Sequence, residues 1–164
     1  MPASIAALLD ALAPIDAQVA KPGGGLEELA RRNEIAWRLM SIAGVGPVTA
    51  LAFIAAIEDV RRFKRTCDTG AYPGLTGKRY QSAGMDMRMG ITKQGDAMAR
   101  PYVYEAANVL LTTVKKRFAL RGWGRRLMRQ PGPQRARAAV AGKRAVLLRR
   151  VCKDGAHFDA VAAA

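Results

Sequence analysis

A chain of 164 residues, half of them apolar, is long enough for one globular domain with a core and too short for two, and its composition excludes a disordered protein. The formal net charge of +14 is unevenly distributed: residues 1–60 carry four bases and seven acids, whereas residues 61–164 carry 23 bases and six acids. A basic block of this size indicates nucleic acid or an anionic membrane surface as the partner, and a basic surface that serves only solubility stays open.

The cysteines and the histidine argue against a metal centre. Cys67 and Cys152 lie far apart without a CxxC spacing, and the one histidine, His157, lies near the C-terminus, where we expect it to be exposed. We therefore expect no metal or other cofactor bound by this chain, and reduced thiols as in a cytoplasmic protein. The first apolar run has no positive segment ahead of it, which argues against a secretory signal.

The first forty residues are expected to form two helices. Residues 3–20 have the helical apolar period, with Pro14 as a kink, and the KPGGG stretch at 21–25 breaks the helix. Residues 26–40 form the second helix, whose buried side is predicted to hold Leu29, Trp37 and Met40. The two helices are either an arm that packs on a partner or a cover for the domain's own core, and both interpretations stay open.

Residues 39–57 are nineteen residues without a charge, a length that would suit a membrane span. Gly44, Gly46 and Pro47 interrupt them, so a pair of short buried helices explains this segment better. The Gly44-Val45-Gly46 turn resembles the helix-hairpin-helix element of DNA-binding proteins, in which backbone N–H groups at a helix N-terminus bind a phosphate oxygen. A purely structural turn is the alternative.

After a basic run at 61–65 (RRFKR), residues 71–96 are rich in glycine and in Lys and Arg and have no long apolar period. We expect a long basic loop here, with a turn near 81–86 and a short extended piece at 88–92. Ser82 lies in its middle. The basic side chains of this loop that we predict to contact a phosphate backbone are Lys78, Arg79, Arg88 and Lys93.

Three further segments complete the predicted fold. A long helix begins at Asp96, its N-cap, and ends in the basic residues 115–117, and residues 121–129 form a short basic segment that two glycines interrupt. The final helix covers residues 134–151, with a basic side made of Arg135, Arg137, Lys143, Arg144, Arg149 and Arg150. The predicted fold is therefore mainly α: a helical domain with a helix-hairpin-helix-like turn and one long glycine-rich basic loop.

The order of several short motifs identifies a family. SIAGVGPVTALAFIAAI is followed by RRFK, AYPGLTGKRYQSAG, DMRMGITKQGD, YEAANVLL and ALRGWGRRL. Each motif is weak alone, but the ordered set resembles the C-terminal transposase domain of the insertion-sequence-110 family of bacterial mobile elements. The resemblance covers residues 38–158, and it implies that residues 1–37 are the remnant of a coiled-coil linker and residues 159–164 a tail.

The resemblance implies a function in DNA transposition. It places Ser82 at the serine of the family's Tyr-x-Ser-Gly stretch, which acts as the nucleophile that joins covalently to a DNA end, and so implies a recombinase activity. DNA, a structured guide RNA and a second copy or a full-length transposase are the implied partners, in the cytoplasm near the nucleoid and not at a membrane. The divalent metal of the family belongs to an N-terminal acidic nuclease domain, not to the domain that this sequence resembles.

The sequence departs from the family pattern at several points. The acidic nuclease domain is absent, Gly77 replaces the usual proline after Gly-Leu-Thr, and Ala83 replaces the glycine after the serine. These departures are typical of a truncated copy that is inactive alone. Two other hypotheses stay open: a stand-alone helix-hairpin-helix protein that binds nucleic acid without chemistry, and an inhibitor that docks with full-length transposase.

Overall fold

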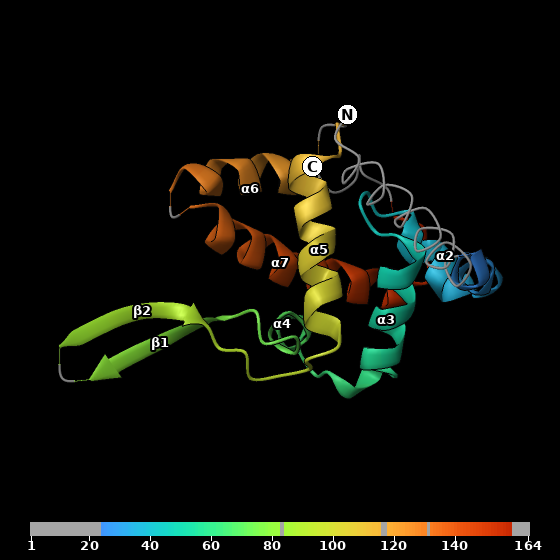
Figure 1. The fold of residues 1–164 in the computed structure, drawn as a ribbon. Helices are drawn as coiled ribbons and strands as arrows, with labels where there is room; N and C mark the ends of the chain where they lie inside the picture. The colour runs from blue at the N-terminus through green and yellow to red at the C-terminus, as the bar shows by residue number, and fades with distance from the viewer. Residues whose placement is uncertain (1–23, 83, 116–117, 131, 159–164) are drawn as a thin grey trace, which may run out of the picture.

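The computed structural model describes residues 24–82, 84–115, 118–130 and 132–158, and its regular elements are mostly helices (Figure 1). In chain order, a helical segment at 24–32 is followed by α2 (Glu34–Met40), α3 (Pro47–Ile57), the 3-10 helix η1 (Val60–Arg62), α4 (Thr66–Ala71), β1 (Gly77–Ser82), β2 (Met85–Ile91), α5 (Ala99–Thr112), α6 (Ala119–Arg129) and α7 (Pro133–Asp154). The mainly α fold predicted from the sequence is confirmed. The helix predicted at 3–20 and the tail at 159–164 lie outside the described residues.

The longest helix, α7, is the centre of the fold, because α2, α4, α5 and α6 all pack on it (Figure 1). Its ends follow from local sequence, since Pro133 occupies the first turn and Gly155 adopts a left-handed conformation (φ 67°) at the C-cap. The apolar residues that α7 buries are Ala136, Ala138, Val140, Ala141, Ala145, Leu148 and Val151. Because most of them are alanines, the neighbouring helices can approach α7 closely.

Two arginines of α7 contradict the predicted basic side of that helix, because Arg144 and Arg149 are buried. Arg144 donates a hydrogen bond to the Ala43 carbonyl (2.6 Å), and burial lowers the pKa of its guanidinium to about 10, so it stays protonated at neutral pH. Arg149 donates to the Phe63 carbonyl (2.7 Å) and to the Thr66 hydroxyl (3.1 Å). Both arginines therefore reach acceptors outside α7, which a buried charge needs.

The helix predicted at 26–40 is interrupted at Asn33, which caps α2. The Asn33 side-chain oxygen accepts a hydrogen bond from the Ala36 backbone N–H at 3.0 Å, which satisfies a donor that the start of a helix leaves open. The KPGGG stretch is not a breaker throughout, because residues 24 and 25 are already helical. A helix tolerates glycine at a cost of about 1 kcal/mol per residue, which packing can offset.

The buried side predicted for these helices is wrong for two large residues. Leu29 and Trp37 are 57% and 50% exposed, whereas Ala30 and Leu39 lie fully in the core. Met40, the third residue of that prediction, is partly buried against the core. The side of α2 that faces the core holds Ala36 and Leu39, so Trp37 lies outside this contact.

The uncharged residues 39–57 form the end of α2, a turn and α3 rather than one continuous span. Pro47 begins α3, and Phe53 and Ile57 of that helix are buried in the core. Within the described ranges, no helix is long and apolar enough to cross a membrane. The predicted pair of short buried helices is therefore confirmed.

The segment predicted as a long loop contains an antiparallel hairpin of β1 and β2, which projects from the helical body (Figure 1). Ser82 pairs with Met85 at the tip, and Gly84 supplies a left-handed backbone there (φ 90°), in agreement with the predicted turn. The strands themselves correct the prediction of a loop. β1 left no apolar period in the sequence because it is exposed along its whole length, so neither of its faces needs apolar side chains. In β2, Met85, Met87, Met89 and Ile91 do alternate with other residues, a strand signal that the prediction did not use.

The start of α5 and the interior of α6 also differ from prediction. The Asp96 carboxylate accepts a hydrogen bond from the Ala99 N–H (2.5 Å), so the predicted capping residue serves a helix whose first residue is Ala99. The segment α6 is one continuous helix through its two glycines. A Cβ at Gly124 would lie 2.7 Å from side-chain atoms of both Leu111 and Val140, so this glycine lets α6 pack closely on α5 and α7.

Candidate nucleic-acid interface

Ser82 is the last residue of β1 and is exposed to solvent. The hairpin holds it away from the helical body, near the tip (Figure 1). A nucleophile that acts on a macromolecular substrate must be reachable from outside, and a serine sealed in the core would exclude that role. The position of Ser82 meets this requirement.

The two faces of the hairpin differ. Because side chains alternate along a strand, Ser82 shares one face of β1 with Tyr80, while Arg79 and Gln81 lie on the other. Tyr80 is 56% exposed, and its partner in β2, Met87, is 50% exposed. An exposed aromatic ring suits the stacking of a nucleobase. Tyr80 is therefore a candidate site residue that a search for basic side chains missed, although it belongs to the Tyr-x-Ser motif.

The four predicted basic residues are distributed along the hairpin rather than gathered around Ser82. Arg79 and Arg88 are partners across the two strands, and Lys78 is exposed at the irregularity beside them. Lys93 follows β2 at the base of the hairpin and is also exposed. The pleat places Arg79 on the face opposite to Ser82. Lys78 lies four residues from Ser82 along the strand, which is about 13 Å, and Lys93 lies at the other end of the hairpin, so none of the four basic residues is adjacent to the serine.

Hydrogen bonds fix the base of the hairpin to the start of α5. Arg100 donates to the carbonyls of Pro73 and Lys93 (both 2.7 Å) and of Gly95 (3.3 Å). The Lys93 N–H in turn donates to the Gly74 carbonyl (3.0 Å). Helix α5 therefore orients the hairpin. Sequence reasoning missed Arg100 because its acceptors are loop carbonyls that only the fold brings together.

The predicted phosphate-binding turn and the hairpin lie on opposite sides of α5 in Figure 1 and do not form one site. Gly44 has a left-handed φ of 80°, and a Cβ there would lie 3.3 Å from the Leu110 backbone nitrogen. Val45 is 7% exposed, and its N–H donates to the Ile42 carbonyl (3.0 Å). Of the three turn residues, only Gly46 is exposed, at the N-cap of α3, so a phosphate contact would depend mainly on it.

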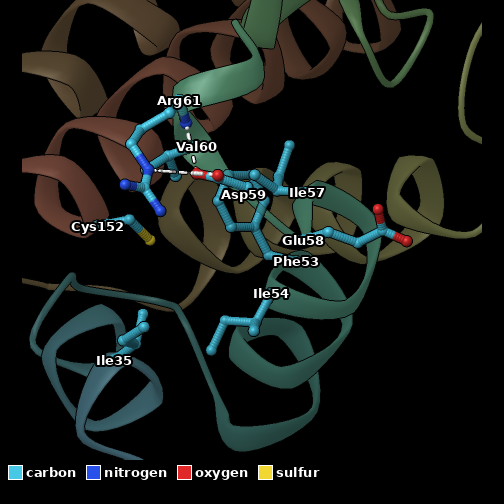
Figure 2. Close-up of a pocket in the computed structure, with 9 residues that line it drawn as sticks. All are labelled: Ile35, Phe53, Ile54, Ile57, Glu58, Asp59, Val60, Arg61 and Cys152. Atoms are coloured by element: carbon cyan, nitrogen blue, oxygen red, sulfur yellow. Dashed lines mark hydrogen bonds and ion pairs between the residues drawn. The ribbon is translucent and has the colours of Figure 1, made fainter.

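A cavity of about 340 Å³ lies on another part of the molecule (Figure 2) and is lined by Ile35, Phe53, Ile54, Ile57, Glu58, Asp59, Val60, Arg61 and Cys152. Burial raises the pKa of the Cys152 thiol to about 11, so the thiol is protonated and weakly nucleophilic at neutral pH. Hydrogen bonds from Arg61 lower the pKa of the Asp59 carboxyl and hold it in place. Among the residues that the structure describes, no group of three or more His, Cys, Asp or Glu could hold a metal ion. None of the residues that the sequence predicted for the site lines this cavity.

Comparison with known proteins agrees with the motifs. Residues 36–121 match the family model described as Transposase IS116/IS110/IS902 family. Over 124 residues the chain is 33% identical to the transposase for insertion sequence element IS1111A of Coxiella burnetii, a match that covers 75% of this chain and 34% of that relative. The transposase for insertion sequence element IS1328 of Yersinia enterocolitica is 33% identical over 79 residues, which are 48% of this chain and 24% of that relative.

The region that matches the family model contains the whole hairpin with Ser82 and the hairpin base, which Arg100 holds by hydrogen bonds. The chain spans about a third or less of the length of these curated relatives. The family model matches half of the residues of this chain, and the Coxiella burnetii relative is 33% identical over 75% of the chain. The chain therefore belongs to the IS116/IS110/IS902 family of transposases.

Proposed function

We propose that this chain is the serine-bearing, nucleic-acid-binding part of a transposase, that it acts in DNA transposition, and that Ser82 is its nucleophile. The observation that supports this most directly is the exposed Ser82 on a projecting hairpin inside the family match. We propose residues 38–158 as the transposase domain, residues 1–37 as an arm and residues 159–164 as a tail. DNA and a guide RNA are the proposed partners, in the cytoplasm.

In the proposed reaction, the Ser82 hydroxyl oxygen attacks a phosphorus atom of the DNA backbone. An Oγ–P bond forms while the P–O bond to one sugar breaks, the hydroxyl proton passes to a base, and the leaving oxygen takes up a proton. Tyr80 would stack a base against the Ser82 face, and Lys78, about 13 Å from Ser82 along the same strand, would bind a neighbouring phosphate of the DNA. We assign the base and any divalent metal to the part of a longer transposase that this chain does not cover, so we propose that the chain is inactive alone.

Replacing Ser82 by alanine is expected to abolish covalent capture of DNA, because the variant lacks the attacking oxygen. The assay mixes the chain with a nicked, labelled DNA end, magnesium and a full-length family transposase whose own nucleophilic serine has been replaced. The expected product is an adduct that survives denaturation and has the mass of this chain plus the DNA strand. Ser41→Ala, which alters another exposed serine, should still give the adduct. Ser82→Ala should bind DNA non-covalently as the unmodified chain does.

The capture assay, together with DNA binding over a range of salt and a transposition assay, separates the three hypotheses. No adduct from the unmodified chain, with or without the longer transposase, would contradict the role of Ser82 as nucleophile. Salt-dependent DNA binding without an adduct would favour the stand-alone helix-hairpin-helix protein. A chain that forms no adduct but lowers the transposition frequency of an intact family member would favour the inhibitor.

A further inference from the structure

Residues 106–153 contain no Asp or Glu but fourteen Lys or Arg residues. This interval includes the second half of α5, all of α6 and nearly all of α7. No carboxylate within the interval neutralises this charge, although Asp154, the next residue along the chain, pairs with Arg150. The effect of the charge therefore depends on which of these basic side chains reach solvent.

Helix α6 gathers part of this charge on one exposed face, which we call the α6 basic face and which consists of Arg125, Arg126 and Arg129. Their spacing places them on one side of the helix, and Arg125 and Arg129 are about 6 Å apart along its axis. Gly122, one turn earlier, is also exposed, and nothing lies within 4 Å of the position that its Cβ would take. A ligand can therefore approach the helix closely beside the three arginines.

Several arginines elsewhere on the surface are engaged within the chain. Arg61 pairs with Asp59 and Arg65 pairs with Asp68, both at 3.2 Å, and Arg62 lies over aromatic rings. In the described part of the chain, no ion pair involves the α6 basic face. The basic run at 61–65, which stands out in the sequence, is thus largely compensated, whereas the arginines of α6 keep their charge for a ligand.

The other side of α6 is occupied by the protein itself. Leu120, Trp123 and Met128 pack against the core, and Gly124 is buried between α5 and α7. The Lys143 ammonium of α7 lies over the Trp123 ring at 4.2 Å. A helix that binds a membrane surface must place its apolar face in the bilayer. Helix α6 has no free apolar face, so its arginines favour a polyanion in water over a lipid surface.

We propose that the α6 basic face binds the phosphodiester backbone of a nucleic-acid duplex without reading its sequence. The planar guanidinium group donates two parallel hydrogen bonds to phosphate oxygens, and the spacing of about 6 Å spans about two successive phosphates of one strand. Figure 1 places α6 and the beginning of α7 on the side of the molecule from which the hairpin projects. The inference rests on the proposed function only in taking nucleic acid as the partner.

The test replaces the three residues together (Arg125→Gln, Arg126→Gln, Arg129→Gln) and measures binding to a DNA duplex and to an RNA duplex over a range of salt concentrations. We expect affinity at moderate salt to fall about tenfold. The negative slope of log K against log salt should become shallower by about two to three. The matched control replaces Arg31, Arg32 and Arg61, which pair with carboxylates, by glutamine. The control loses the same charge and should bind within about twofold of the unmodified chain.

Equal losses in the two triple variants, or an unchanged salt slope in the α6 variant, would overturn the inference. Loss of binding to both duplexes supports recognition of the backbone, and loss for one duplex alone identifies DNA or RNA as its source. Thermal unfolding checks that the α6 variant is folded. The outcome is independent of covalent capture: a chain without a Ser82 adduct that still shows the slope change keeps this inference and loses the proposed nucleophile.

Discussion

Replacing Gly95 by alanine is expected to destabilise the base of the hairpin by about 3 kcal/mol or more. Gly95 has a φ of 149°, and a Cβ there would lie 2.0 Å from the Tyr72 carbonyl oxygen and 2.8 Å from the Gly74 nitrogen. Both are backbone atoms, so neither can rotate out of the way. The Tyr72 carbonyl also accepts the Asp96 N–H at 2.9 Å, so moving it breaks a contact that joins the hairpin base to the start of α5.

The matched control is Gly90→Ala, which adds the same methyl group inside β2. Nothing lies within 4 Å of the Cβ position at Gly90, so the free energy of unfolding should change by less than about 0.5 kcal/mol. Urea denaturation followed by circular dichroism measures global stability, and limited proteolysis measures opening of residues 72–96. A Gly95→Ala protein that matches Gly90→Ala in both measurements would contradict the backbone clash.

The elements that the sequence predicted well are those with local signals at their ends. Helix α3 begins at Pro47 after a glycine N-cap, and α7 begins at Pro133 and ends at Gly155. These signals can be recognised without knowledge of the rest of the fold. Proline in the first turn lacks an N–H that would have no partner there, and glycine at the C-cap adopts the left-handed backbone that ends a helix. The capping role of Asp96 was predictable for the same reason, although the helix that it caps begins only at Ala99.

The hairpin was only partly predictable from pattern. β1 is exposed throughout, so it has no buried face that would impose alternating apolar and polar residues. Met85, Met87, Met89 and Ile91 do alternate along β2, but this signal was not used. The turn near Gly84 and the glycines that the base requires were also visible in the sequence. The motif predicted that Ser82 is functional, but the pairing of the strands was needed to place Tyr80 on the same face and Arg79 on the other.

Charge was the least reliable guide to the site. The run at 61–65 is among the most basic in the sequence, yet Arg61 and Arg65 pair with neighbouring carboxylates in the structure. The segment at 121–129 was predicted as interrupted, yet it is a continuous helix with one basic face. A sequence gives the number of charges, whereas their effect depends on the partners and burial that the fold assigns to each side chain.

Arg149 and Arg150 are neighbours in sequence, but Arg149 is buried and Arg150 is exposed. Their replacement is therefore expected to change stability by very different amounts. Replacing Arg149 by alanine should lower the free energy of unfolding by about 3 kcal/mol, because it removes two hydrogen bonds and leaves the buried Phe63 carbonyl without a donor. Arg150 is exposed and pairs with Asp154 at 3.3 Å. Arg150→Ala should therefore cost about 1 kcal/mol or less.

Urea denaturation of the two alanine variants measures this difference, and Arg149→Lys serves as an intermediate. Lysine keeps the charge, but its single ammonium group cannot reproduce the planar fork that reaches Phe63 and Thr66 together, so the stability of this variant should lie between those of the unmodified chain and Arg149→Ala. Both alanine variants lose the same formal charge, so a difference in stability between them reports burial and hydrogen bonding. Equal unfolding midpoints for the two would show that the contact between α7 and the Phe63 segment contributes little to the fold.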